Sequence, residues 1–518
     1  MALAALVLLG AQLRFQALEA RSLWGDEVIT QAIVTGHSFK GLPESGSRSA
    51  GDLAALTEGR AASPGAVLDQ VYTGWPDERT PPTYYLALSL WTRIMGTGEL
   101  GLRSFSALVD TASIPLVFLI GVELGGTWCG LGAAALFALV PVQLAHAGNA
   151  RCYSLLVFLA LCGSWSVLRG SVVGYLATTV LGGLCHPFYG IAWLPQAAFL
   201  ALQGPRRRTF LLASALGLLI VVIAASTQIS SLEKSRFRSG PASWTWTLER
   251  PILTGRGGWS LYHGALSDRK TKPLERPNLP AELLRLERPA RDGLLIPVAV
   301  LLVAAGAWWA AVHGTTRTRT FLRMALLPVA GMALLDGAGL TRFGLEARST
   351  LLLHPFLYWL MALHPRLAPA ALGLALLLGL AGPLQGPAPQ EYPPRQGFRE
   401  VAEYVAAHAD PEDRVVVVGI PSHAVTLGRL LPPSTTVQWF RIPPGRQARD
   451  AESPEWLALA WAPPRGRLWV VWCPSGGGVL SELRRQCYHN LGPGWRWVEG
   501  QEFPSLLLEC YEPRPAGP

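Results

Sequence analysis

The chain has 518 residues, of which 50% are hydrophobic and only 15% are charged, and its mean hydropathy is +0.28. Soluble globular proteins carry roughly 25% charged residues, so this composition argues against a wholly soluble protein. The net charge of +9 does not indicate nucleic-acid binding, because Lys and Arg gather in short loops between apolar segments, where they would meet lipid headgroups. We expect a polytopic α-helical membrane protein.

The first apolar segment covers residues 1–20 and is predicted to span a membrane. A loop of residues 21–82 follows, and two adjacent carboxylates, Asp26 and Glu27, lie near its start. Residues 26–38 predict a short helix at the membrane interface, because the segment is too short to cross. The carboxylate pair therefore lies where a membrane helix leaves the bilayer.

Apolar segments recur along the chain up to residue 386. A helix of roughly 20 residues crosses a hydrocarbon core of about 30 Å, so we expect about 11 or 12 transmembrane helices. The predicted spans after the first loop are residues 83–96, 103–122, 128–146, 152–168, 172–185, 187–203, 209–228, 292–313, 320–338, 350–363 and 367–386.

The arginines predict the orientation of the chain, because Lys and Arg gather in short cytoplasmic loops. The loop of residues 229–291 and the C-terminal tail are then on the outer face, as is Asp26. An even number of full crossings would return the tail to the inside. Segment 83–96, which is short and contains Arg93, is therefore expected not to cross fully. The arginines that share the cytoplasmic face are Arg169, Arg206 to Arg208, Arg317, Arg319, Arg323 and Arg366.

The pattern changes after residue 386. A Pro-rich linker is followed by helical segments that alternate with short β-rich runs, such as residues 414–419 and 468–472. This alternation predicts a small α/β domain. We therefore divide the chain into a transmembrane module, residues 1–386, and an outer-face α/β domain, residues 387–518. No Gly-rich dinucleotide motif follows a strand in this tail.

Several polar residues share the predicted outer face, and ionisable groups beside a bilayer are costly unless they serve a site or pathway. Structural alternatives exist: the carboxylates could favour the first turn of a helix, and the arginines could extend to lipid headgroups. The residues are Asp26, Glu27, His146, Asn149, Arg151, Tyr153, His186, Tyr189, Glu346 and Arg348.

Together these groups fit one kind of chemistry. A carboxylate can accept the proton of an acceptor hydroxyl while that hydroxyl attacks. Two arginines can hold a phosphate through charge-assisted hydrogen bonds and stabilise it as a leaving group. A donor phosphate on a lipid whose tail stays in the membrane suits a site at this position.

Six motifs occur in a characteristic order: SLWGDE, TPPTYYLALSLW, GLRSFSAL, GNARCYSLL, LCHPFYG and EARSTLLLHP. In this the chain resembles the GT-C polyprenyl-phosphate-sugar glycosyltransferases, and most closely the bacterial relatives of protein O-mannosyltransferases and aminoarabinose transferases. The resemblance covers roughly residues 1–365. It implies transfer of a monosaccharide, such as mannose, from a polyprenyl phosphate at the outer face, with inversion at the anomeric carbon.

The resemblance also implies roles for individual residues. Asp26 corresponds to the base of the first outer loop and has Glu27 beside it, while Arg151 and Arg348 correspond to arginines near the donor phosphate. The residues expected to shape the site are Tyr153, His186, Asn149 and Glu346.

The sequence departs from the family pattern at three positions. Thr80 stands where many relatives have His or Lys, Asn149 where many have Glu, and Ser349 where an aromatic residue is usual. A divalent cation is therefore left open as a cofactor, and the acceptor could be a glycan, a lipid or a protein. Two other classes also stay open: a transporter or flippase of a lipid-linked or anionic solute, and a non-catalytic relative.

Overall fold

The structure is a computed structural model, and its residues fall into two compact units. The helical unit consists of Met1–Gln16, Asp77–Tyr84 and Arg103–Pro393, and the α/β unit of Ala17–Pro76, Tyr85–Leu102 and Pro394–Pro518. The structure describes residues 1–16, 18–19, 22–39, 42–43, 45–74, 80–203, 207–225, 301–315, 318–319, 321–322, 351–381, 397–440, 466–473, 495–503 and 506–513.

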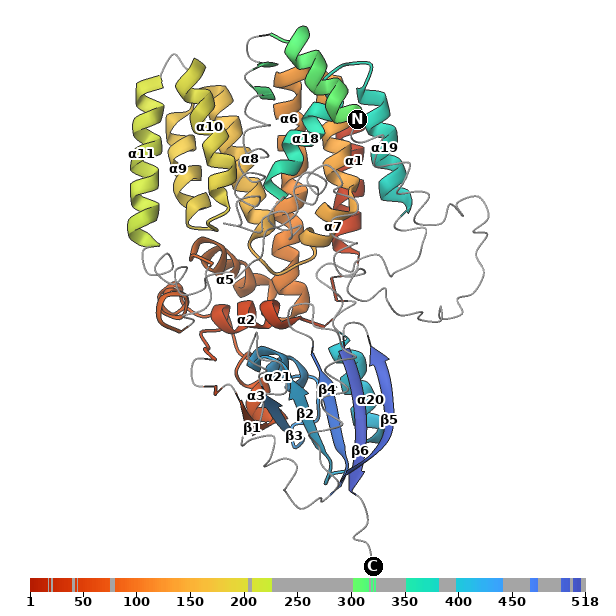
Figure 1. Ribbon diagram of the computed structural model, residues 1–518. Helices are drawn as coiled ribbons and strands as arrows, with labels where there is room; N and C mark the ends of the chain where they lie inside the picture. Colours follow the sequence, from red (N-terminus) through yellow and green to blue (C-terminus); the bar gives the residue numbers. More distant parts are fainter. Residues whose placement is uncertain are drawn as a thin grey trace, which may run out of the picture. The chain divides into compact units, whose positions relative to one another are not determined.

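The helical unit is a bundle of apolar helices (Figure 1). Helices that are apolar on all sides fit the interior of a large protein or of a membrane. The elements are α1 (Ala2–Phe15), most of α6 (Glu99–Leu139), α7 (Pro141–Ala147), α8 (Tyr153–Arg169), α9 (Val172–Gly183), α10 (Tyr189–Gln203), α11 (Arg207–Ala224), a helix at Leu301–Val312, the 3-10 turn η4 (Leu351–Leu353), α18 (His354–Ala362) and α19 (Ala368–Ala381).

The long element α6 consists of two helical arms joined by a tight turn at Gly125 and Gly126. Gly126 has φ 82° and ψ −177°, a conformation that is accessible mainly to glycine. The arms lie side by side, since a Cβ on Gly121 would come within 2.7 Å of the Cα of Gly130. The turn falls between two of the predicted spans and confirms that division.

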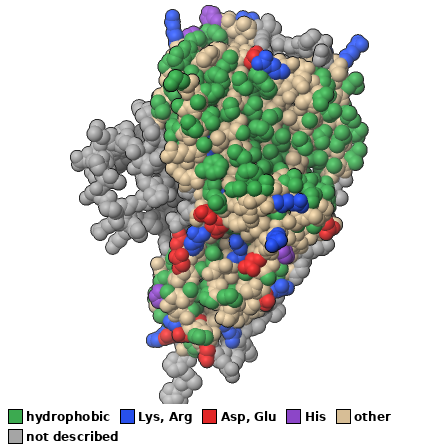
Figure 2. Space-filling view, turned by 180° about the vertical axis from the view of Figure 1, so that it is seen from behind, with side chains coloured by type: hydrophobic (Ala, Val, Ile, Leu, Met, Phe, Trp, Pro, Cys, Tyr) green, Lys and Arg blue, Asp and Glu red, His purple; other side chains and the backbone are tan. Residues whose placement is uncertain are grey.

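Two of the described helices are long and apolar enough to span a membrane, Glu99–Leu139 and Arg207–Ala224. Figure 2 shows that hydrophobic side chains cover most of one face of the helical unit, whereas charged side chains are frequent on the α/β unit. Soluble monomers rarely expose apolar patches larger than a few hundred Å². Large apolar side chains that are more than half exposed include Leu8, Val173, Leu194, Leu212, Ile223 and Trp308.

A buried ion pair connects α1 to both arms of α6. The Nε of Arg14 donates to Oδ2 of Asp110 at 2.7 Å, and both side chains are almost fully buried. The remaining guanidinium nitrogens donate to the carbonyl oxygens of Gly10 (3.0 Å), Ala138 (2.9 Å) and Phe137 (3.1 Å). A charge inside an apolar unit needs such partners, so Asp110 has a structural role.

The α/β unit is built on a six-stranded sheet in the order β1-β3-β2-β4-β6-β5. β2 is parallel to β3 and β4, and all other neighbours are antiparallel. β2 and β4 confirm the two predicted β-rich runs. The strands are β1 (Ser45–Ser49), β2 (Arg414–Val418), β3 (Thr436–Phe440), β4 (Leu468–Trp472), β5 (Trp495–Phe503) and β6 (Leu506–Pro513).

Hydrophobic side chains form the core of the sheet and the buried faces of two helices. In β4, a central strand of the sheet, every residue is buried. α20 (Phe398–His408) buries Phe398, Val401 and Val405, which recur at helical spacing and form one apolar face. α21 (Pro421–Gly428) begins with proline at its first turn, where the missing N–H has no helical partner to lose.

The α/β unit contains more of the chain than the predicted domain of residues 387–518. The first loop supplies β1, which pairs antiparallel with β3, so the edge of the C-terminal sheet is formed by N-terminal sequence (Figure 1). The loop also forms α2 (Gly25–Val34), which confirms the predicted short helix, as well as α3 (Ala50–Ala54), α4 (Pro64–Asp69) and the π-helical turn η1 (Gln70–Gly74).

Segment 83–96 forms the 13-residue helix α5 (Thr83–Met95), most of which belongs to the α/β unit. At 1.5 Å per residue this helix is about 20 Å long. A hydrocarbon core of about 30 Å is thicker than that. The described helices α1 and α9, which fall within predicted spans, have similar lengths of 14 and 12 residues. That segment 83–96 does not cross fully therefore stays a prediction.

Candidate active site

The two carboxylates of the first loop lie in the first turn of α2 and differ in their surroundings. Glu27 is fully buried, and its Oε2 accepts the backbone N–H of Trp24 at 3.3 Å. This is the contact by which a residue at the third helical position caps a helix start. Asp26 is only partly buried, and its backbone carbonyl accepts the Thr30 hydroxyl at 3.0 Å. Glu27 thus has a capping role, and the Asp26 carboxyl is the better candidate for a base.

The turn between α7 and α8 carries the polar residues predicted there. The N–H of Asn149 donates to the His146 carbonyl at 3.2 Å, and the N–H of Arg151 donates to the Asn149 carbonyl at 2.8 Å. α8 then begins at Tyr153. All four side chains are buried, and Arg151 is only 7% exposed. An arginine that extended to headgroups would keep its head in water, so burial disfavours that alternative for Arg151.

The rings of His146, Tyr153 and His186 form a row of contacts. The rings of His146 and Tyr153 have their centroids 5.4 Å apart at 77°, and those of Tyr153 and His186 are 6.0 Å apart. The Nδ1 of His186 accepts the N–H of Phe188 at 3.1 Å. A neutral imidazole with an accepting Nδ1 carries its proton on Nε2, so His186 can donate a hydrogen bond from that atom.

Four of the sequence motifs meet at this end of the helical unit. The Ser106 hydroxyl of the GLRSFSAL motif donates to the Arg151 carbonyl at 3.4 Å. The N–H of Thr83, which follows the Pro-Pro pair, donates to the Leu184 carbonyl at 3.0 Å. The Cys185 thiol of LCHPFYG approaches the Cys152 carbonyl at 3.7 Å. Segments that are distant in sequence therefore converge around the turn that holds Arg151.

The remaining predicted site residues, Glu346 and Arg348, lie outside the described residues, as does the 229–291 loop. Asp26 and Glu27 belong to the α/β unit, and His146 to His186 belong to the helical unit. Within the described residues, no three His, Cys, Asp or Glu side chains converge as metal ligands would. The proposed chemistry below therefore uses the side chains of the protein alone.

No protein-family model matches the sequence, and no curated protein matches it. Among solved structures, the chain is similar to ArnT from Cupriavidus metallidurans in the apo state, with 14% identity, 98% of this chain and 97% of that chain covered, and a TM-score of 0.42. It is also similar to the oligosaccharyltransferase of Archaeoglobus fulgidus in the apo form, with 13% identity, coverage of 91% and 69%, and a TM-score of 0.48. A third similar structure is the mycobacterial arabinofuranosyltransferase AftD, with 14% identity, coverage of 94% and 41%, and a TM-score of 0.44.

One of the ArnT structures is bound to undecaprenyl phosphate, and one structure of the archaeal oligosaccharyltransferase AglB contains an inhibitory peptide and a dolichol-phosphate.

Two buried arginines of the helical unit were not among the predicted site residues. Arg103 is fully buried and precedes Ser106 by three residues, so both lie on the same face of α6. Its signals in the sequence were its place in the GLRSFSAL motif and at the start of an apolar span. Arg14 is the partner of Asp110, and nothing in the sequence links positions that are 96 residues apart.

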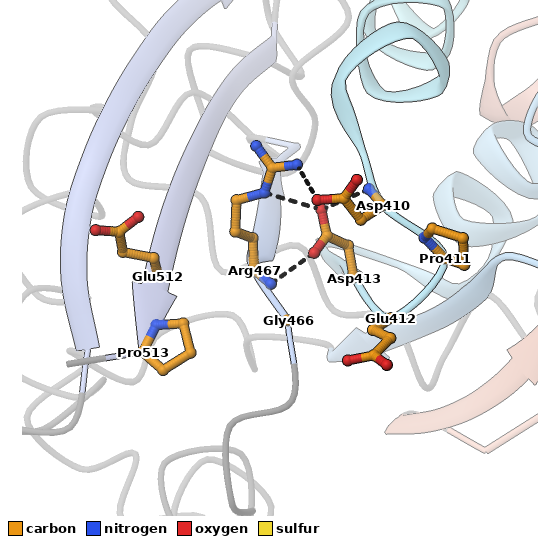
Figure 3. Close-up of a pocket in the computed structure, with 8 residues that line it drawn as sticks. All are labelled: Asp410, Pro411, Glu412, Asp413, Gly466, Arg467, Glu512 and Pro513. Atoms are coloured by element: carbon orange, nitrogen blue, oxygen red, sulfur yellow. Dashed lines mark hydrogen bonds and ion pairs between the residues drawn. The ribbon is translucent and has the colours of Figure 1, made fainter. Parts of the chain in front are cut away.

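The α/β unit has an open pocket of about 610 Å³ between the starts of β2 and β4 (Figure 3). Asp413 accepts hydrogen bonds from the N–H of Arg467 (2.6 Å), the Trp469 indole (2.9 Å) and the N–H of Asp410 (2.9 Å). The Arg467 guanidinium also bonds to Asp410 at 2.8 Å. These contacts join the two strand starts, so we assign Asp413 a structural role.

Proposed function

We propose that the protein is an integral membrane glycosyltransferase that moves a monosaccharide from a polyprenyl-phosphate donor to an acceptor at the outer face of the membrane. The observation that carries the proposal is the convergence of four motifs around the buried Arg151. A buried guanidinium at the end of an apolar bundle is suited to an anionic headgroup whose tail remains in lipid.

The proposed reaction is a single displacement. Asp26 accepts the proton of the acceptor hydroxyl as its oxygen forms a bond to the anomeric carbon. The bond between that carbon and the phosphate oxygen breaks on the opposite side, so the anomeric configuration inverts. The lipid phosphate leaves with the bonding electrons, and Arg151 and Arg348 stabilise its charge.

The surface of the helical unit supports membrane insertion. Exposed apolar side chains extend along α9, α11 and the helix at Leu301–Val312, and few charges interrupt them (Figure 2). Removing such surface from water is worth about 25 cal/mol per Å². An odd number of crossings, with α5 lying at the interface, would keep Asp26 and the α/β unit on one side.

The test uses the purified full-length protein in lipid nanodiscs with radiolabelled polyprenyl-phosphate sugars. We expect release of sugar to water or its transfer to an added acceptor, and loss of at least about 100-fold in rate for Asp26→Asn. Asp52→Asn is the matched control, because Asp52 also lies in the first turn of a helix of this loop but is exposed. Full activity of Asp26→Asn would remove the proposed base. In liposomes, movement of intact donor across the bilayer without cleavage would indicate a flippase.

A further inference from the structure

We propose that α21 of the α/β unit sets the position of the proposed base, and that His423 is the positioning residue. The contact runs through Gly25, which directly precedes Asp26 at the start of α2. Every residue involved belongs to the α/β unit. The inference deepens the proposed function and rests on it for the role of Asp26.

The first observation is the close approach of Gly25 to α21. A Cβ on Gly25 would lie 3.2 Å from the Ser422 hydroxyl oxygen, 3.3 Å from Cδ2 of His423 and 3.5 Å from its Nε2. Gly25 is buried and lies within helical backbone, so the absence of a side chain gives space rather than conformational freedom. The start of α2 therefore rests directly on these two side chains.

The second observation is that His423 cannot move away from Gly25. The residue is buried, with an exposed fraction of 6%. Phe398 of α20 packs against it with a centroid distance of 5.8 Å, and a Cβ on Gly419 would come within 2.5 Å of its Nδ1. The imidazole thus fills the space between two glycines, and a larger ring would displace α2.

The third observation concerns polarity. Within the part of the chain that the structure describes, the Ser422 hydroxyl and the Nδ1 of His423 have no hydrogen-bond partner. Burying unpaired polar groups is costly, and an apolar residue would stabilise this packing better. Stability alone does not account for these two residues beside Gly25.

The first loop is also attached to the α/β unit at other points. The Gln31 side chain donates to the Thr97 carbonyl at 2.8 Å, and the N–H of Ala50 donates to the Thr435 carbonyl at 2.8 Å. β1 adds its pairing with β3. A change at the contact of Gly25 with His423 would consequently tilt the start of α2 without releasing the loop.

The experiment compares Gly25→Val and His423→Phe with the wild-type protein in the sugar-release assay. A misplacement of about 1 Å in a catalytic group can cost about 100-fold in rate. We expect kcat to fall by about that factor while KM for the donor changes less than about 3-fold, because Asp26 acts on the acceptor proton. Gly25→Ala should be milder, and Ser422→Ala in the same chain should restore part of its kcat by removing the oxygen 3.2 Å from the new Cβ.

Gly428→Ala is the matched control. It makes the same chemical change at the other end of α21, where the new Cβ would lie 2.8 Å from Cβ of Leu53 in α3. If any disturbance of α21 packing lowered kcat, the Gly428→Ala variant would lose activity as well. We expect kcat within about 2-fold of wild type, since the contact is with α3 and not with α2.

Hydrogen exchange separates a tilted α2 from an unfolded protein. We expect faster exchange over residues 25–34 in Gly25→Val and His423→Phe, with β2 and β4 unchanged. If β2 and β4 also lose protection, His423→Gln, which is closer in size to histidine, is measured instead. Unchanged kcat with unchanged α2 exchange in folded variants would overturn the inference. If the wild type cleaves no donor, the proposed function fails, whereas the exchange result still decides whether His423 positions α2.

Discussion

Replacing Asp110 by asparagine should destabilise the helical unit strongly, because the Arg14 guanidinium would remain buried without its counter-charge. The two charged groups are 2.7 Å apart and almost fully buried. At an effective dielectric constant of about 20, their attraction is about 6 kcal/mol. In the variant, three backbone carbonyls still accept hydrogen bonds from Arg14. These bonds offset part of the lost attraction. The expected loss is therefore about 3 to 5 kcal/mol, the usual cost of removing one partner of a buried pair.

The assay is unfolding of the full-length protein in detergent, followed by the loss of helical circular dichroism. The double variant Arg14→Met with Asp110→Leu removes both charges and should recover most of the stability, since well-packed apolar replacements of buried pairs are often neutral. If the single variant Asp110→Asn is as stable as the wild type, the ion pair contributes little and the reasoning is wrong. If the double variant is less stable than the single one, packing and not charge holds α1 against α6.

Three further outcomes are expected. Burial lowers the pKa of His423 from 6.5 to about 4, so the unfolded chain binds more protons between these values, and the α/β unit should lose about 3 kcal/mol as the pH falls from 6.5 to 4. His423→Gln should flatten that part of a stability-against-pH curve, and an unchanged slope would contradict the assignment. Gly126→Ala should cost about 2 kcal/mol in thermal unfolding, because φ is 82° there; the same change at Gly373 in α19 is the control. Arg151→Lys should raise KM for the donor at least about 10-fold, because lysine lacks the bidentate geometry, and unchanged donor kinetics would exclude Arg151 from the phosphate site.

Most helices could be predicted from sequence because their apolar runs end at identifiable signals. α8, for example, ends at Arg169, and Gly170 adopts φ 69°, a common way to end a helix. The predicted span of residues 152–168 differs from it by one residue at each end. The α2 helix was likewise indicated by its acidic first turn.

Other features depend on contacts that sequence cannot reveal. β1 has the sequence SGSRS, which has no alternation of apolar and polar residues and therefore gives no strand signal. It becomes a strand only because β3 offers an unpaired edge. The distribution of arginines predicted that Arg151, Tyr153 and His186 share one face. The ring contact of Tyr153 with His186 and the packing of Gly25 on His423 depend on tertiary structure alone.

The pairing of β1 with β3 also bears on how the protein is made. Ser49 pairs with Thr436, so 387 further residues (436 − 49) must be synthesised after Ser49 before the chain includes its partner. At roughly 5 to 20 residues per second, the ribosome needs about 20 to 80 s for that length. During this interval the β1 segment has no strand to pair with. An apolar segment with unpaired backbone groups would be prone to aggregate. Serine, glycine and arginine keep it soluble until the C-terminal residues emerge, so assembly of the α/β unit is among the last events in biogenesis.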